Sequence, residues 1–155
     1  MKEALVLGIG NTLLQDDGVG VRVMQILAEQ REKWPGVRFV DGGTLSFTLA
    51  DTVGRADRML AIDGANMGAA PGEVRLFRNA EIDEQLRTTG GSVHEVSLSD
   101  LFDMARLTDM LPRQRALIAI QVQSTGWGEH LTAPVSRGVA RAVALAESVL
   151  DRWHG

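Results

Sequence analysis

The sequence contains no cysteine. A thiol nucleophile, a disulfide framework and a metal site built on thiolates are therefore excluded. Long apolar runs are also missing, since none approaches the roughly 20 residues that a membrane-spanning helix needs. An excess of positive charge is missing as well, since the formal net charge of −4 gives no basic footprint for nucleic acid. We therefore expect neither a nucleic-acid partner nor a membrane partner.

Histidine is rare, so the residues available for imidazole chemistry are His94, His130 and His154. An apolar segment begins almost at the first residue, which leaves no room for a signal peptide. The 155 residues, of which 45% are hydrophobic, fit one domain with a core of ordinary size. We expect a single domain over residues 1–155 that is a cytoplasmic monomer.

The stretch 5–21 organises the rest of the chain. Its apolar run ends in the Gly-Ile-Gly of residues 8–10, which is typical of a buried strand and a tight turn. Apolar residues then recur at helical spacing, so Asp16 and Asp17 are predicted at the start of a helix. A carboxylate there can cap free backbone N–H groups, and we expect one of the two to do only that. The other is a candidate for a cation or proton-transfer site at the end of a strand.

A dinucleotide-binding loop is the first alternative. That fingerprint requires a third glycine where Leu13 stands, and two carboxylates would repel a phosphate at the start of the helix. Asp41, at the end of the next predicted strand, does resemble the acid that binds a ribose in such domains. A nucleotide-binding domain therefore remains the less favoured interpretation.

Acids next to glycine close three predicted strands. Asp16 and Asp17 follow the first strand, Asp41 follows the second, and Asp63 follows the third. Since parallel strands end at the same edge of a sheet, we expect all these carboxylates at one edge. For Asp41, a turn-forming role before two glycines explains the pattern equally well.

The remaining pattern alternates strands with helices. Residues 73–78 alternate as an edge strand does, and 79–91 is polar without a strong period, which predicts a loop. The other predicted elements are a short helix at 45–53, a helix from Ser97 with Asp100 as its capping-box partner, a buried strand at 116–122, a loop at 124–132 and a long helix from Pro134. Together they predict an α/β fold, a three-layer α/β/α sandwich around a mostly parallel sheet of about five strands.

The loop 124–132 and the region 79–91 are expected to flank the site and to contact a substrate. Trp127 is the most informative residue of the loop 124–132. An aromatic side chain in a glycine-rich loop either anchors a partner or covers the core, and the anchor is slightly favoured.

Local protease signatures are incomplete. His94-Glu95 begins like the zincin motif, but that motif needs a second histidine where Leu98 stands. His94 also replaces the last glycine of a nucleophile elbow, and no Asp-Thr-Gly or Asp-Ser-Gly triplet supports a pepsin-like dyad. What remains is a set of strand-end carboxylates and a loop histidine, which can hold a borderline divalent ion. From spacing alone, a loop histidine without a ligand role is the more common case.

Several short motifs follow one another along the whole chain. They are the glycine-rich stretch 7–20, Asp41-Gly42-Gly43-Thr44, Ile62-Asp63-Gly64-Ala65, Ser92-Val93-His94-Glu95, Ile120-Gln121 and the closing helix. This ordered set resembles the nickel-iron hydrogenase maturation endopeptidases. Ser46 departs from the resemblance because many relatives have glycine there, which leaves the shape of that loop open.

The resemblance implies a phosphorylase/hydrolase-like fold and a metal-binding set that is also the catalytic set. By position its members are Asp17, Asp63 and His94. The implied reaction removes the C-terminal extension of a hydrogenase large-subunit precursor after nickel insertion, with nickel supplied by the precursor. Three donors without a thiolate should hold nickel weakly in the isolated protein. Asp41 is one candidate for the general base, and a non-catalytic nickel chaperone that binds the precursor uncut remains the alternative.

Overall fold

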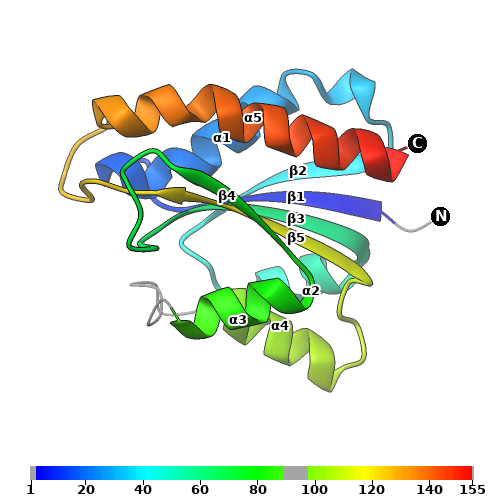
Figure 1. Ribbon diagram of the computed structural model, residues 1–155. Coiled ribbons are helices and arrows are strands. Elements are labelled where there is room, and N and C mark those ends of the chain that lie inside the picture. The colour runs from blue at the N-terminus through cyan, green and yellow to red at the C-terminus, as the bar shows by residue number, and fades with distance from the viewer. Residues whose placement is uncertain (1–2, 89–97, 155) are drawn as a thin grey trace.

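A five-stranded sheet forms the centre of the computed structural model, which describes residues 3–88 and 98–154 (Figure 1). Its strands are β1 (Glu3–Ile9), β2 (Val37–Gly43), β3 (Ala56–Ala65), β4 (Val74–Arg78) and β5 (Gln114–Gln121). The helices are α1 (Val19–Ala28), α2 (Leu49–Gly54), α3 (Ala80–Thr88), α4 (Leu98–Leu107) and α5 (Ala133–His154), with 3-10 turns η1 (Gln15–Gly18) and η2 (Arg31–Lys33).

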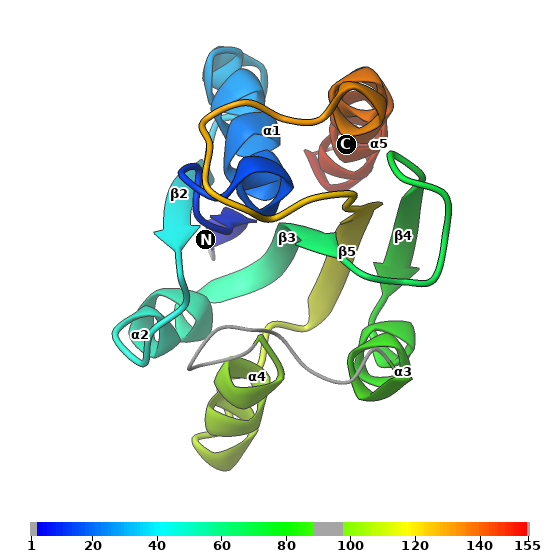
Figure 2. The same ribbon diagram turned by 90° about the vertical axis from the view of Figure 1, so that its left-hand side faces the viewer.

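The strand order is β2-β1-β3-β5-β4. The first four of these strands run parallel, whereas β4 pairs antiparallel with β5 at the edge of the sheet. This confirms the mostly parallel sheet and the edge strand that the alternating residues predict. The carboxyl ends of the parallel strands lie on the left in Figure 1 and face the viewer in Figure 2.

Helices cover both faces of the sheet, which confirms the three-layer sandwich. Helices α1 and α5 lie on one face, and α2, α3 and α4 lie on the other (Figure 2). Alternation along each strand separates the two cores, because successive side chains point to opposite faces. In β3, Leu60 and Ile62 pack with α1 and α5, whereas Met59 and Ala61 pack toward the other three helices.

The prediction of a loop over residues 79–91 is wrong for most of that segment, because Ala80–Thr88 forms helix α3. The helix buries a stripe of only Ile82 and Leu86, one turn apart, and such a narrow stripe gives a weak period. Its start is fixed by Glu81, whose Oε1 accepts a hydrogen bond from the backbone N–H of Arg78 (2.8 Å). The N–H of Asn79 donates to the carbonyl of Arg115 (3.0 Å). Helix α3 therefore begins at the amino edge of the sheet, opposite the end at which the site is expected.

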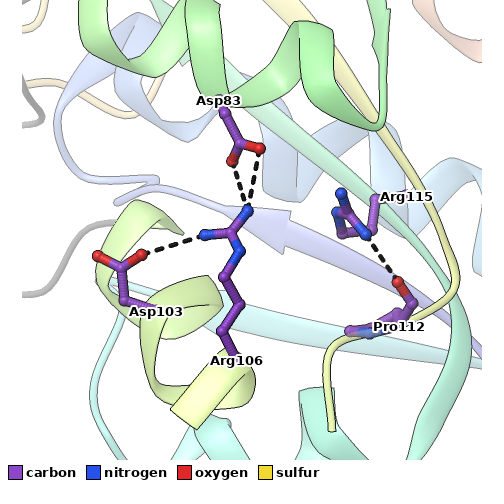
Figure 3. Close-up of polar contacts among 5 residues, drawn as sticks. All are labelled: Asp83, Asp103, Arg106, Pro112 and Arg115. Carbon is purple, nitrogen blue, oxygen red and sulfur yellow. Dashed lines mark hydrogen bonds and ion pairs between the residues drawn. The ribbon is translucent and has the colours of Figure 1, made fainter. Parts of the chain in front are cut away.

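Arg106 of α4 joins α4 to α3 (Figure 3). Its Nη2 donates to both carboxylate oxygens of Asp83 (2.9 Å each), and its Nη1 donates to Asp103 (3.1 Å). These contacts hold together the two helices that flank residues 89–97. The described part of the chain contains no helix that is long and apolar enough to cross a membrane.

Candidate active site

The loop between β1 and α1 is folded so tightly that it needs glycine. Gly10 adopts a φ of 127°, and a Cβ there would lie 1.7 Å from the carbonyl oxygen of Asp17. The loop therefore closes on itself and forms the 3-10 turn η1 directly ahead of α1. The helix is capped by Gly18 without a side-chain hydrogen bond, so the expectation that Asp16 or Asp17 caps it is wrong. The side chains of Asp16 and Asp17 therefore have roles other than capping the helix.

Asp17 is buried at the carboxyl edge of the sheet, with 6% of its surface exposed. Its Oδ2 accepts a hydrogen bond from the backbone N–H of Asn11 (2.9 Å), which fixes the side chain across the glycine loop. This places one carboxylate just beyond the end of β1, as the sequence predicts.

Asp63 lies inside β3 and not at its end, because the strand continues to Ala65 and pairs Asp63 with Ala119 of β5. The prediction that the strand ends at Asp63 is therefore wrong by two residues, because Gly64 and Ala65 continue the backbone pairing with β5. Ala119 belongs to the core under α2, α3 and α4, and direct pairing places Asp63 on that same face. The Oδ1 atom of Asp63 is buried and accepts no hydrogen bond from any described residue.

The two carboxylates lie close enough to interact. Burial raises the pKa of Asp63 well above its usual range, the charge of Asp17 raises it further, and a hydrogen bond from Gly64 lowers it in part. None of these effects, which come from described residues, supplies a positive charge to an ionised Asp63. A divalent cation would supply that charge and would coordinate the unpaired oxygen, so the residues present fit a metal ion.

The third member of the predicted set, His94, lies outside the described residues. Among those that are described, no group of three or more acids, histidines or cysteines is placed to hold a metal ion. The other histidines do not complete the set: His130 is exposed in the loop before α5, and His154 ends α5 at the opposite edge. The structure thus brings Asp17 and Asp63 together and leaves the role of His94 as a prediction.

Asp41 lies within β2, exposed, and forms a turn. Its Oδ1 accepts a hydrogen bond from the backbone N–H of Gly43 (2.8 Å), which supports the turn-forming interpretation. The same residue lines an open groove of about 240 Å³ together with the glycine loop. A slightly larger hollow of about 270 Å³ lies at the amino ends of β3 and β5, but several arginines and no carboxylate line it. Of these two hollows, the one at the carboxyl edge is better suited to a cation.

Asp16 has a role that the sequence does not reveal. Its side chain is fully buried and accepts four hydrogen bonds from the segment between β5 and α5. The donors are the backbone N–H groups of Gln123 (2.9 Å), Ser124 (3.0 Å) and Thr132 (2.8 Å) and the hydroxyl of Thr132 (2.7 Å). Burial by itself would raise the pKa of Asp16, but the hydrogen bonds from Ser124, Thr132 and Gln123 leave it below its usual value. Asp16 therefore holds the loop between β5 and α5 in place through hydrogen bonds.

Replacing Asp16 by asparagine is expected to lower the free energy of unfolding by about 1–3 kcal/mol. The amide NH2 group would face N–H donors, and these buried donors would lose their acceptor. Urea denaturation measures the change. Asp51→Asn is the control, because its carboxylate forms an exposed ion pair with Arg55 and its loss should cost about 0.5 kcal/mol or less. Equal effects of the two substitutions would contradict a stabilising role for the hydrogen bonds of Asp16.

Gln121 is a second residue whose role emerges only from the fold. It is buried at the end of β5, and its Oε1 accepts hydrogen bonds from the backbone N–H groups of Met67 (2.6 Å) and Ala69 (3.2 Å). Its Nε2 donates to Asn66 (3.3 Å). Gln121 thereby holds the loop that follows Asp63. A polar residue at the end of an apolar strand is the sequence signal that points to it.

Known proteins match this chain over nearly its whole length. A model of the hydrogenase maturation protease family matches residues 21–149. The hydrogenase expression/formation protein HupM of Azotobacter chroococcum is 33% identical over 147 residues, which cover 94% of this chain and 70% of that protein. The hydrogenase 2 maturation protease of Escherichia coli is 34% identical over 122 residues, 77% of this chain and 73% of that one.

Solved structures agree with these matches. The hydrogenase maturating endopeptidase HybD from E. coli superposes with a TM-score of 0.86 at 27% identity, covering 97% of this chain and 93% of that one. The NiFe hydrogenase maturation protease HybD from Thermococcus kodakarensis superposes with a TM-score of 0.80 at 32% identity, covering 96% and 99%. The similarity thus extends to both the sequence and the fold.

Proposed function

Because the chain belongs to the hydrogenase maturation protease family, whose members are endopeptidases, we propose that it processes a nickel-iron hydrogenase large-subunit precursor. The proposed reaction hydrolyses one peptide bond and releases the C-terminal extension after nickel has been inserted. The observation that carries this proposal is the pair of carboxylates, Asp17 and Asp63, at the carboxyl edge of the sheet. The charge of Asp17 disfavours the ionised form of Asp63, and a cation bound by both carboxylates would offset that repulsion.

We propose that the cation is the nickel already bound in the precursor. Asp17 and Asp63 supply two oxygen donors, and His94 supplies a nitrogen donor by the motif resemblance. Imidazole and carboxylate suit nickel, but a set without thiolate binds it only modestly. The precursor therefore has to complete the coordination. In this proposal, the enzyme recognises a finished precursor by the metal it carries, and an empty precursor offers nothing for the carboxylates to bind.

The cut itself requires an activated water and a polarised carbonyl. Nickel in the substrate can polarise the scissile carbonyl or lower the pKa of a bound water. Asp41 lines the groove next to the glycine loop and is the candidate general base. Its hydrogen bond to Gly43 occupies only one carboxylate oxygen, so the side chain can still accept a proton.

A non-catalytic chaperone is the second candidate function, because the same carboxylates would bind nickel in a precursor without cutting it. Incubating the protein with nickel-loaded precursor and measuring the intact mass of the large subunit separates the two. The protease is expected to shorten the precursor at a single bond. An unchanged mass, with the two proteins in complex, would instead support the chaperone.

A further inference from the structure

The loop between β5 and α5, residues 122–132, lies across the loop between β1 and α1 at the carboxyl edge of the sheet (Figure 2). The backbone N–H of Gln15 donates to the carbonyl of Gly128 (2.8 Å), and the N–H of Gly128 donates to the carbonyl of Leu13 (2.9 Å). Leu14 and Gly128 thus form a parallel bridge. The two loops are joined as a short piece of sheet, although they are more than a hundred positions apart in the chain.

Further contacts hold this crossing rigid. The carboxylate of Asp16 accepts hydrogen bonds from both ends of the loop 122–132, and the N–H of Asp16 donates to the carbonyl of Ser124 (3.0 Å). The hydroxyl of Ser124 bonds to the side chain of Gln15, and the guanidinium of Arg22 in α1 donates to the carbonyl of Glu129. The loop is therefore ordered by the β1–α1 loop and by α1, independently of any partner.

Two large apolar side chains are exposed at this rigid crossing. Trp127 is 83% exposed and Leu13 is 50% exposed. They are neighbours in space because Leu13 bonds to Gly128, the residue after Trp127. Trp127 therefore does not cover the core, which leaves the anchor as the interpretation of this residue. The backbone that carries this exposed indole is held by the hydrogen bonds described above. A tryptophan has only two side-chain torsions to order when a partner covers it, which suits an interface hot spot.

We propose that Leu13 and Trp127 form a substrate platform that binds an extended, apolar segment of the precursor next to the bond that is cut. The proposal rests on the proposed function. The platform is continuous with the candidate active site, since Leu13 and Asp17 belong to the same short loop. The part of the precursor next to a nickel ion held at Asp17 and Asp63 would therefore lie close to the platform. An extended segment presents alternate side chains on one side, and an apolar one would cover the indole.

Fluorine NMR tests the platform directly. The chain has three tryptophans, of which Trp34 is buried and Trp153 is half-buried. Protein labelled with 5-fluorotryptophan is expected to give three resonances, and Trp127→Phe assigns the one from Trp127. Addition of nickel-loaded precursor is expected to shift the Trp127 resonance and leave that of Trp34 in place.

Kinetics supply the second readout. Trp127→Ala and Leu13→Ala are each expected to raise KM for nickel-loaded precursor about tenfold, with kcat and the thermal midpoint nearly unchanged. The matched control is Leu107→Ala, because Leu107 is 87% exposed at the end of α4 and lies away from the site. This control is expected to leave KM unchanged.

The two measurements separate this inference from the function on which it rests. Cleavage by the wild-type protein, with an unmoved Trp127 resonance and an unchanged KM in Trp127→Ala, would overturn the platform alone. A shift of the Trp127 resonance without cleavage would support the platform and overturn the protease. A precursor that is neither bound nor cut would overturn both.

Discussion

Replacing Asp63 by asparagine is expected to lower the rate of precursor cleavage by about 100-fold or more while the protein stays folded. Asparagine keeps the size of the side chain and removes the charge that would bind the cation. The same result is expected for Asp17→Asn, because its amide oxygen can still accept the hydrogen bond from Asn11. Initial rates with nickel-loaded precursor measure the loss.

The stability of the Asp63 variant gives this prediction a second readout. The Oδ1 atom of Asp63 is buried without a hydrogen-bond partner among the described residues, and the charge of Asp17 lies nearby. Removing one of two like charges should leave the thermal midpoint unchanged or raise it, as expected where a site is held for function at the expense of stability. A large fall in the midpoint would show that the lost activity is a folding defect.

Asp57 provides the matched control within the same strand. It lies near the amino end of β3, and its Oδ1 is also buried without a hydrogen bond among the described residues. Asp57→Asn therefore makes the same chemical change away from the site and should leave cleavage unchanged. Wild-type rates for Asp63→Asn, or equal losses for both variants, would remove Asp63 from the active site.

Replacing Gly20 by alanine is expected to destabilise the protein by about 3 kcal/mol or more. A Cβ at this position would lie 2.1 Å from the carbonyl oxygen of Ile62 and 2.6 Å from that of Ile9. Both obstacles are backbone atoms of the central strands, so helix α1 would have to move away from the sheet. Alanine would gain about 1 kcal/mol of helix propensity over glycine, which is too little to offset the displacement.

Urea denaturation of Gly20→Ala measures this effect, with Gly126→Ala as the control. A Cβ on Gly126 would lie no closer than 3.8 Å to the nearest atoms, so that variant should stay within about 0.5 kcal/mol of wild type. A Gly20→Ala protein as stable as wild type would mean that α1 does not pack against β1 and β3 at this distance.

The fold is largely readable from the sequence because each strand carries its own signal. The apolar runs around Leu7, Leu60 and Ile118 are buried on both faces, and they appear as continuous hydrophobic segments. Parallel pairing then brings the residues after Ile9 and Ile62 to one edge, so Asp17 and Asp63 can be assigned to a common site without a structure. The shared edge can be predicted because it depends on strand direction alone, whereas the roles of the two carboxylates stay a prediction.

The features that the sequence does not predict depend on contacts between distant segments. Asp16 looks like a helix cap because its neighbours begin a helix, yet its hydrogen-bond donors lie more than a hundred residues away. Helix α3 is missed because only Ile82 and Leu86 pack into the core, and nearly all of its other residues are charged or polar. Local pattern cannot distinguish such a helix from a polar loop.

The central claim is that nickel in the precursor is what licenses the cut. The most direct test is the ratio of cleavage rates for nickel-loaded and nickel-free precursor with the wild-type protein, followed by intact mass. The account predicts shortening of the loaded precursor at a single bond and no cleavage of the metal-free precursor over the same time. Equal cleavage of both precursors would contradict it, because binding of the metal by Asp17 and Asp63 would then not control cleavage.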